Sequence, residues 1–535
     1  MNRAVQEFDY IVVGAGSSGC VLANRLSADG RHTVLVLEAG PRDTNPWIHI
    51  PIGYGKTIFD RRINWGYETE PESALDGRRI YWPRGKVLGG SGSVNGLVYI
   101  RGQREDFDGW AALGNRGWGY EDMLPWFRKA EHQVRGGDAY HGVDGPLWVS
   151  DLAEHHPLCE AFIASAQHCG IPVNPDFNGE CQDGVGYFQL TTRNGLRCSP
   201  ATAYLRPARR RPNLTVLTGA LARRVLCSGR RAVGLEFERD GTVQTAAARR
   251  EVLLASGVIN SPQLLLLSGI GAPEQLARAG IETTLPLPGV GANLQDHLQV
   301  RVVLKAKRPI TYNDVFASPL RTLWAGAQWA LARRGPLTVG AGQAGAFVNV
   351  MRDAVRPDVQ FHFITFSADR PGQGLHRFPG FTASVCQLRP ASRGHIELAD
   401  ANPRSAPRIH ANYLSATEDL TVLRKAVRLA RRIAGTSPLV ELVEQEFAPG
   451  AAAADDDASI DAFIRASAGS IFHPVGTCKM GNDADAVVDG ALRVRGMERL
   501  RVIDASIMPT LVSGNTNAAA IAIGEKGAAL VLGNE

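Results

Sequence analysis

The chain has 535 residues, of which 44% are hydrophobic and 21% charged, a composition typical of a folded globular protein. The net charge is only +5, and the basic run at residues 206–211 lacks interleaved aromatic residues, so nucleic-acid binding is not indicated. No run of about 18 apolar residues occurs, which argues against a membrane-spanning helix.

The eight cysteines are scattered and show no CxxC or other metal-binding spacing. The first predicted strand begins within about ten residues of the start, which leaves no room for a targeting segment. We therefore expect reduced thiols, no metal site and a cytoplasmic location.

The opening of the chain predicts a strand, a glycine-rich turn, a helix and a second strand, over residues 8–13, 14–19, 20–28 and 33–37. In the turn, Gly14 permits a tight bend, Gly16 allows close approach of a pyrophosphate, and Gly19 allows close helix–strand packing. Glu38 ends the second strand and can accept hydrogen bonds from a ribose. This context predicts a dinucleotide site, with the phosphates at the helix N-terminus.

Strand and helix patterns recur in the middle and at the end of the chain. Strands are predicted at 214–217, 222–227, 232–236 and 251–255, a helix at 261–268, then a strand at 500–503 and a helix at 517–530. Alternating patterns at 359–366, 382–388 and 394–398 predict an antiparallel sheet. We expect two interleaved domains with the functional site between them: a dinucleotide-binding domain of residues 1–154, 191–304 and 468–535, and a substrate domain of residues 155–190 and 305–467.

A second glycine-rich segment, residues 82–96, contains five glycines among small residues. Such a segment can lie flat against a bulky ring and offer backbone N–H groups to it, which favours a flavin over a nicotinamide. The motifs at residues 14–19, 85–95, 256–271 and 473–481 together resemble the glucose–methanol–choline (GMC) oxidoreductases over essentially the whole chain. Residues 37–46 and 176–186 are most similar to the branch of flavin alcohol dehydrogenases of alkane utilisation, and the chain also resembles choline and polyethylene-glycol dehydrogenases.

The resemblance implies an α/β, three-layer, Rossmann-like FAD-binding domain interleaved with an α+β substrate domain built on an antiparallel sheet. It implies FAD contacts from Gly14, Gly16, Gly19, Glu38, Arg84, Gly89, Gly90, Ser91, Asn95, Gly96, Val225, Asp504 and Ala505. Choline-oxidase-like members carry a histidine bonded covalently to the flavin where this chain has Val94. Because valine cannot form that bond, we expect FAD to be bound non-covalently.

Oxidation of an alcohol requires a base for the hydroxyl proton and a hydride acceptor, which a flavin supplies. His473 is the predicted base, because a neutral imidazole accepts a proton near working pH, and Pro474 holds its backbone extended. Asn517 is predicted to donate its amide N–H to the substrate oxygen as alkoxide character develops, although an asparagine before a helix is also a common N-cap.

Two other histidines are candidates for the site. His297 is either a second base or, as we favour, a structural residue at the domain junction. His362 alternates with apolar residues on a predicted strand, and it either points toward the cleft or, as we favour, is a structural histidine. The aromatic residues Phe361, Phe363 and Phe366 indicate either an apolar substrate cavity or ordinary core packing.

These features predict the FAD-dependent oxidation of a primary, aliphatic alcohol to its aldehyde, with electrons passed to a quinone or another acceptor. Choline dehydrogenation and an oxygen-using alcohol oxidase are the alternatives within the family; a flavin-bearing lyase and a non-catalytic FAD-binding protein stay open. Residues 320–334 form a helix that either covers the substrate domain or rests on the inner face of the cell membrane near a quinone pool.

Overall fold

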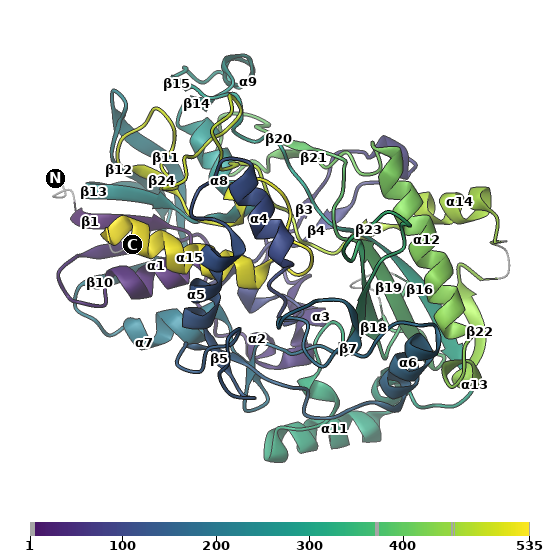
Figure 1. The fold of residues 1–535 in the computed structure, drawn as a ribbon. Coiled ribbons are helices and arrows are strands. Elements are labelled where there is room, and N and C mark those ends of the chain that lie inside the picture. The colour runs from purple at the N-terminus through teal and green to yellow at the C-terminus, as the bar shows by residue number, and fades with distance from the viewer. Residues whose placement is uncertain (1–5, 370–373, 451–452, 454, 534–535) are drawn as a thin grey trace.

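The computed structural model describes residues 6–369, 374–450, 453 and 455–533. Two seven-stranded sheets organise these residues, and helices cover them (Figure 1). The longer helices are α1 (Ser17–Leu26), α4 (Arg104–Ala112), α5 (Tyr120–Ala130), α6 (Pro157–His168), α8 (Gly257–Leu267), α11 (Pro319–Ala332), α12 (Thr417–Ala434), α14 (Asp457–Ser467) and α15 (Asn517–Leu532).

The first sheet has the strand order β10-β2-β1-β13-β12-β11, and β24 lies beside β13. These strands are β1 (Gln6–Val13), β2 (Val34–Glu38), β10 (Leu214–Thr218), β11 (Ala220–Ser228), β12 (Arg231–Arg239), β13 (Thr242–Leu254) and β24 (Leu500–Val502). The pairs joining β10, β2, β1, β13 and β24 are parallel. Beyond β13 the sheet continues with β12, antiparallel to β13, and then β11, antiparallel to β12. The predicted strand–turn–helix–strand opening is therefore confirmed as β1, α1 and β2.

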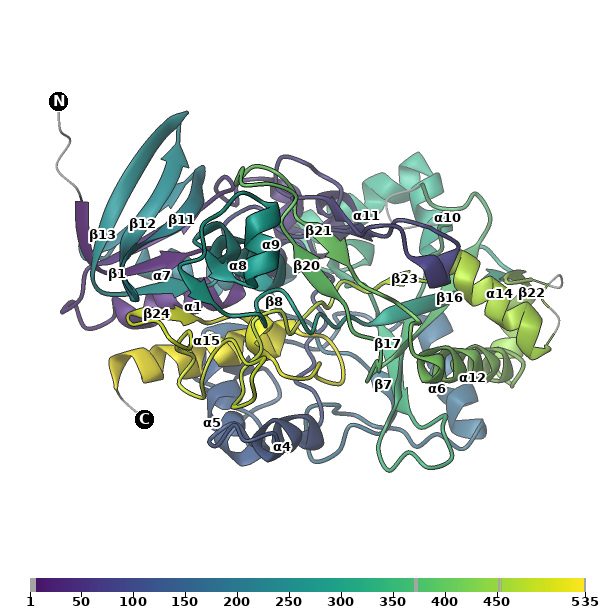
Figure 2. The same ribbon diagram turned by 90° about the horizontal axis from the view of Figure 1, so that it is seen from above.

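The central parallel strands are apolar where helices shield them from water. Every residue of β2 is buried, and so is the second half of β1. Figure 2 shows β1 and β24 between α8 on one side and α15 on the other. Helix α15 approaches α1 closely at Gly524, where an added Cβ would lie 3.0 Å from Ser18 Cα. This packing brings the C-terminal helix to the N-terminal turn.

The second sheet is antiparallel, in the order β22-β16-β19-β18-β17-β7, with β23 beside β16. Its strands are β7 (Gly184–Tyr187), β16 (Leu298–Ala306), β17 (Ala344–Val348), β18 (Val359–Ile364), β19 (Gly380–Gln387), β22 (Val443–Ala448) and β23 (Gly469–Ser470). Helices α6 and α12 cover one face of this sheet, and the other face is turned toward the first sheet (Figure 1). The predicted antiparallel sheet is confirmed.

Burial shows which of Phe361, Phe363 and Phe366 line a substrate cavity and which belong to the core. Phe361 and Phe363 are fully buried in the core of the second sheet, where Phe363 stacks on Phe162 with ring centroids 4.5 Å apart. Only Phe366, beyond the end of β18, lines the cavity described below. Core packing therefore accounts for the first two aromatic residues.

Two predicted domain boundaries need correction. Strand β23, Gly469–Ser470, lies beyond the boundary that we placed after residue 467, but it pairs with β16 in the second sheet. Strand β16 crosses the boundary that we placed after residue 304, because its hydrogen-bonded neighbours β19 and β22 belong to the second sheet. The whole strand, Leu298–Ala306, therefore belongs with the substrate segments. The remaining boundaries stay predictions.

Helix α11 does not bury its apolar stripe against the substrate domain. Leu320, Leu323, Trp324 and Leu331 are 80%, 72%, 65% and 88% exposed, and Ala325 is the buried residue of the helix. In both views the helix lies at the periphery of the molecule (Figures 1 and 2). Across the described residues, none of the helices combines the length and the apolar character needed to cross a membrane.

Candidate active site

A cavity of about 730 Å³ lies between the two sheets. This volume is within the range of about 300–1,000 Å³ that small-molecule and cofactor sites occupy. Its walls come from segments far apart in the sequence, including residues 13–18, 37–39, 83–98, 255–260, 299–301, 362–368, 471–474 and 515–520. The interleaving of the two domains thus builds one site from both ends of the chain.

The glycine-rich turn presents the N-terminus of α1 to this cavity. Gly14 has a φ of +98°, and an added Cβ would lie 2.6 Å from Ala255 O, so only glycine fits there. Gly19 does not line the cavity but packs against the turn, where an added Cβ would lie 1.9 Å from Gly14 O. Because the first backbone N–H groups of α1 have no partner within the helix, the turn can bind phosphate groups.

Glu38 lines the same end of the cavity. Its carboxylate accepts hydrogen bonds from the backbone N–H groups of Ala15 at 3.0 Å and Gly40 at 2.8 Å. Each oxygen retains a second lone pair, so hydroxyl groups of a ribose can still be bound. Burial raises the pKa of Glu38 to about 7.

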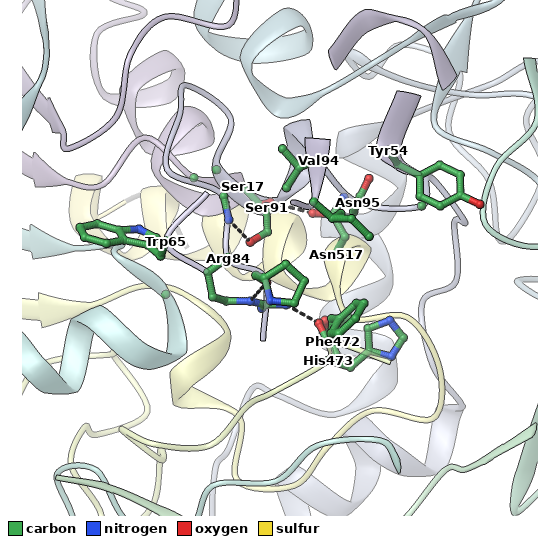
Figure 3. A pocket seen from close by; sticks show the side chains of 18 of the residues that line it. Ser17, Tyr54, Trp65, Arg84, Ser91, Val94, Asn95, Phe472, His473 and Asn517 are labelled. Carbon is green, nitrogen blue, oxygen red and sulfur yellow. Dashed lines mark hydrogen bonds between the residues drawn. The ribbon is translucent and has the colours of Figure 1, made fainter. Parts of the chain in front are cut away.

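The second glycine-rich segment packs directly on the first. Gly90 has a φ of +53°, and an added Cβ would lie 2.7 Å from Gly16 Cα. Further residues of this segment that line the cavity are Arg84, Gly85, Ser91, Val94, Asn95 and Gly96 (Figure 3). This close fit places glycine backbone from both segments on the cavity wall, a glycine surface against which a flat ring system can lie.

The structure places the other predicted FAD contacts as follows. Asp504 and Ala505 line the cavity, and Asp504 is fixed by Gly257 N–H at 2.9 Å and the Ser261 hydroxyl at 2.6 Å. Gly89 and Val225 do not line it. The Val225 N–H donates to Ser268 Oγ at 2.8 Å, and its strand reaches the cavity at Ala222 instead. The structure therefore brings most, but not all, of the predicted cofactor residues to one surface.

Arg84 joins this surface to the segment that carries His473. Its Nη2 donates to Phe472 O at 2.6 Å, and the two side chains lie next to His473 in Figure 3. Phe472 has a φ of +71°, a left-handed conformation that costs roughly 1–3 kcal/mol for such a residue. The arginine contact therefore helps to hold the strained turn that presents His473.

The His473 imidazole lies between two polar groups. Its Nδ1 is 3.1 Å from Nδ1 of His297, and its Nε2 is 3.2 Å from Nδ2 of Asn515. His297 Nε2 in turn lies 2.9 Å from Leu388 O. A carbonyl oxygen only accepts hydrogen bonds, so His297 must carry its proton on Nε2.

This chain of hydrogen bonds fixes the tautomer of His473. Burial lowers the pKa of His297 to about 4, so the ring is neutral near pH 7 and its Nδ1 can only accept. His473 therefore donates from Nδ1, which leaves the lone pair on Nε2. Burial, followed by the effects of His297, His362 and Arg84, holds the pKa of His473 well below its usual range, so this ring is also neutral.

The backbone of His473 is held separately by Asp296. The carboxylate accepts the His473 N–H at 2.7 Å and also accepts the hydroxyl groups of Ser470 and Tyr413. Burial raises the pKa of Asp296 to about 6. Asp296 and His297 thus fix the main chain and the ring of His473 from adjacent positions, which places His297 in a supporting role and not in that of a second base.

The two asparagines before α15 have different partners. Asn517 accepts a hydrogen bond on Oδ1 from the Ser17 hydroxyl at 2.6 Å, and it does not cap the helix with its side chain. Its Nδ2 group therefore remains for a ligand in the cavity that the residue lines (Figure 3). Asn515, which the sequence analysis missed, is the residue that contacts the Nε2 lone pair of His473. The sequence could have indicated Asn515 as a site residue, because it lies two positions before Asn517 in the same segment.

His362 lines the cavity, the alternative that we did not favour. It is 3% exposed, and none of the described residues meets hydrogen-bond geometry with either ring nitrogen, although Asn515 lies close enough to act on its pKa. Burial lowers the pKa of His362 to about 3. A buried polar ring without a partner carries an energetic cost unless a bound ligand meets it, which makes His362 a candidate for substrate contact.

Residues 8–299 and 390–524 match the two sequence domains that define the GMC oxidoreductases. The chain is a GMC oxidoreductase. It is 44% identical to the mitochondrial choline dehydrogenase of Mus musculus, covering 99% of this chain and 90% of that protein. It is 43% identical to the alcohol dehydrogenase [acceptor] of Pseudomonas putida, covering 98% of this chain and 96% of that protein.

Solved structures agree with this assignment. Pyridoxine 4-oxidase from Mesorbium loti superposes with a TM-score of 0.88 at 32% identity, covering 97% of this chain and 98% of that one. A formate oxidase of Aspergillus oryzae, solved in a study of FAD modification, gives a TM-score of 0.91 at 26% identity over 99% of both chains. The GMC oxidoreductase described here therefore has the expected fold, binds FAD and acts on CH–OH donors.

Outside the cavity, this GMC oxidoreductase brings three possible metal ligands together. His395, Glu397 and His410 lie on the antiparallel strands β20 (His395–Glu397) and β21 (Arg408–His410), with one ligand atom of each within 4.8 Å of the others. Their sequence spacing did not indicate this group, because the strand pairing and not the spacing creates it. None of the three lines the cavity.

Proposed function

We propose that this enzyme oxidises a primary, aliphatic alcohol to the aldehyde, with His473 as the general base. The observation that carries the proposal is the path from Leu388 O through His297 to His473, because it leaves a lone pair on His473 Nε2 at the cavity. The substrate hydroxyl would replace Asn515 as the partner of that atom and lose its proton to it. His473 would then be an imidazolium whose Nδ1–H stays bonded to His297.

Asn517 would hold the substrate oxygen. Ser17 fixes the orientation of its amide, so Nδ2 can donate to an oxygen that becomes more negative as the proton leaves. His362, whose ring nitrogens meet hydrogen-bond geometry with none of the described residues, is positioned to contact the same substrate from the opposite sheet. These residues orient the alcohol, and the bound FAD supplies the hydride acceptor.

The cofactor would be dissociable. Val94 lines the cavity at the end of the second glycine-rich segment, and its aliphatic side chain offers no atom for a covalent bond to the flavin. Affinity would come from the α1 N-terminus, Glu38 and the glycine surface. Release of intact FAD on denaturation tests this part of the proposal.

The lining of the cavity supports an uncharged alkyl chain better than choline. Among the described residues that line it, the carboxylates are Glu38 and Asp504, and both already accept backbone N–H groups near the phosphate-binding turn. A quaternary ammonium group would thus have no free carboxylate to meet. Choline dehydrogenation remains the second candidate because the Mus musculus relative carries that name.

A quinone is the proposed electron acceptor, reached at the inner face of the cell membrane. Exposed apolar residues of α11 could enter a bilayer, and residues 319–334 contain Arg321, Arg333 and Arg334 but no acidic residue. On its other side the helix contributes Thr322 and Gly326 to the cavity lining. Membrane contact through α11 would therefore bring the opening of the site close to lipid-soluble molecules.

Anaerobic mixing with alcohols tests the proposed reaction. Alkanols should bleach the flavin, choline should do so more weakly, and His473→Gln should slow bleaching by about 10²–10⁴-fold while retaining FAD. Reoxidation that is faster with a soluble quinone than with oxygen would support a dehydrogenase over an oxidase. Failure of every alcohol to bleach the flavin would contradict the proposal and favour a lyase.

A further inference from the structure

An arginine lies on the cavity wall that the second sheet forms. Arg301 belongs to β16, and the strand register places it in one row with Ser384 on β19 and His362 on β18. Its neighbours Val300 and Val302 point to the opposite face, into the hydrophobic core. Arg301 therefore points into the cavity, which it lines together with His362.

The guanidinium of Arg301 has no hydrogen-bond or ion-pair partner among the residues that the structure describes. Two arginines that are buried elsewhere each have partners: Arg101 donates to Glu131 at 2.7 Å, and Arg197 donates to Asn95 Oδ1 at 2.6 Å. Burial lowers the pKa of Arg301, opposed by the nearby hydroxyl of Tyr54. An enclosed charge without a partner is costly to keep, so the site favours a ligand that supplies the opposite charge.

We propose that Arg301 binds a carboxylate on the substrate, so that the preferred alcohol is a hydroxy acid. This inference rests on the proposed alcohol oxidation and names the class of alcohol. The planar guanidinium can bind both oxygens of a carboxylate at once. The same charge would repel a cationic alcohol such as choline.

The distance along β16 sets the approximate length of such a substrate. Arg301 lies four positions after His297, which immediately precedes β16 and contacts His473, and extended chain rises about 3.3 Å per residue, giving about 13 Å between the Cα atoms of Arg301 and His297. Ile364 at the end of β18 and Phe366 just beyond it also line the cavity. This spacing favours several CH₂ groups between the hydroxyl and the carboxylate.

Three alcohols of equal length test the inference on the FAD-loaded protein without oxygen: hexanol, ω-hydroxyhexanoate and ω-aminohexanol. The apparent Kd from the rate of flavin bleaching should be about tenfold to a hundredfold lower for the hydroxy acid than for hexanol, and highest for the amine. Arg301→Gln should remove the preference for the acid, and Arg301→Glu should reverse it toward the amine. Arg308→Gln, an exposed change beyond the same strand, serves as the unchanged control.

Binding of hexanoate, which has no hydroxyl to oxidise, gives a second readout through the flavin absorbance spectrum. Wild-type protein should bind it, and Arg301→Gln should lose that binding while keeping its FAD. If hexanol bleaches the flavin but the acid has no advantage and hexanoate does not bind, Arg301 is not an anion site, although the alcohol oxidation stands. If no alcohol bleaches the flavin, the proposed function fails, and hexanoate binding alone still decides the role of Arg301.

Discussion

The Nδ1 atoms of His297 and His473 lie 3.1 Å apart, so one ring must donate to the other. His473 is the donor. His297 donates from its protonated Nε2 to the backbone carbonyl of Leu388, so its Nδ1 can only accept. His297 would therefore act on the proposed base, His473, without itself lining the cavity. This relationship joins a residue of the substrate sheet to one of the C-terminal segment and makes the domain junction part of the site.

Replacing His297 should slow the reaction, because His297 fixes which ring nitrogen of His473 carries the proton. In His297→Ala the Nδ1–H of His473 loses its acceptor, so the ring can rotate or carry its proton on Nε2. We expect flavin bleaching by alkanol to slow by about a hundredfold, as misplacement of a reacting group does. Stopped-flow absorbance measures this, and His155→Asn, an exposed histidine, is the control. An unaltered rate in His297→Ala would remove the proposed relay.

Activity should decline on acidification only below the pKa of a free imidazole. Because the pKa of His473 is held well below its usual range, Nε2 keeps its lone pair as the pH falls through about 6.5. The rate of flavin bleaching should therefore stay constant from pH 8 to about pH 6 and decline only below that. A limb centred above about 6.5 would mean that a different group accepts the proton.

Acid should also destabilise the fold earlier than carboxylate titration alone predicts. His297, His362 and His473 are buried and neutral, with the pKa of His297 lowered to about 4 and that of His362 to about 3. Below about pH 6.5 the unfolded chain binds protons on these three histidines that the folded chain does not, so their contribution to the free energy of unfolding falls as the pH drops. Glu38 and Asp296, whose pKa values are raised to about 7 and about 6, oppose this fall. Urea unfolding at pH 7 and pH 5 measures this, and His362→Gln should reduce the difference between them.

The sequence predicted the parallel sheet and its glycine turn because a buried strand, a close helix approach and a positive φ each demand particular residue types locally. The partners of His473 could not be read in this way. His297 lies 176 positions from it, and their contact depends on where β16 meets the C-terminal segment. The roles of Phe361 and Asn515 were hidden for the same reason, since the face that a residue turns to its neighbours follows from the pairing of distant strands.

Substitutions of Asn515 and Asn517 should have different effects on the rate of flavin bleaching. Asn517→Ala removes the amide proposed to stabilise the substrate oxygen, and losing one such donor costs about 10²–10³-fold in rate. Asn515→Ala removes only a resting partner of His473 that the substrate would displace, so a smaller loss is expected. Single-turnover bleaching rates compare the pair. A larger loss in Asn515→Ala would assign the oxygen-binding role to Asn515 instead.

The glycine surface should tolerate no side chain. In Gly90→Ala the new Cβ would lie 2.7 Å from Gly16 Cα, and the residue would keep a φ of +53°. The left-handed backbone alone costs about 1–2 kcal/mol, and the two glycine-rich segments would be pushed apart. The flavin absorbance per protein should fall sharply. Gly109→Ala, in α4 with no atom within 4 Å of the added Cβ, should keep its full FAD content.

Helix α11 should bind anionic vesicles through its exposed stripe. Leu320 and Leu323 are 80% and 72% exposed, and burying each in lipid is worth about 1.5–3 kcal/mol, to which each nearby arginine adds about 1 kcal/mol. The double variant Leu320→Asp with Leu323→Asp should therefore remain in the supernatant when wild-type protein sediments with vesicles. Val355→Asp, a change at a residue that is 97% exposed, should sediment like wild type. If the double variant instead converts a dimer to a monomer and vesicles capture neither protein, the stripe is an interface between two copies of the chain.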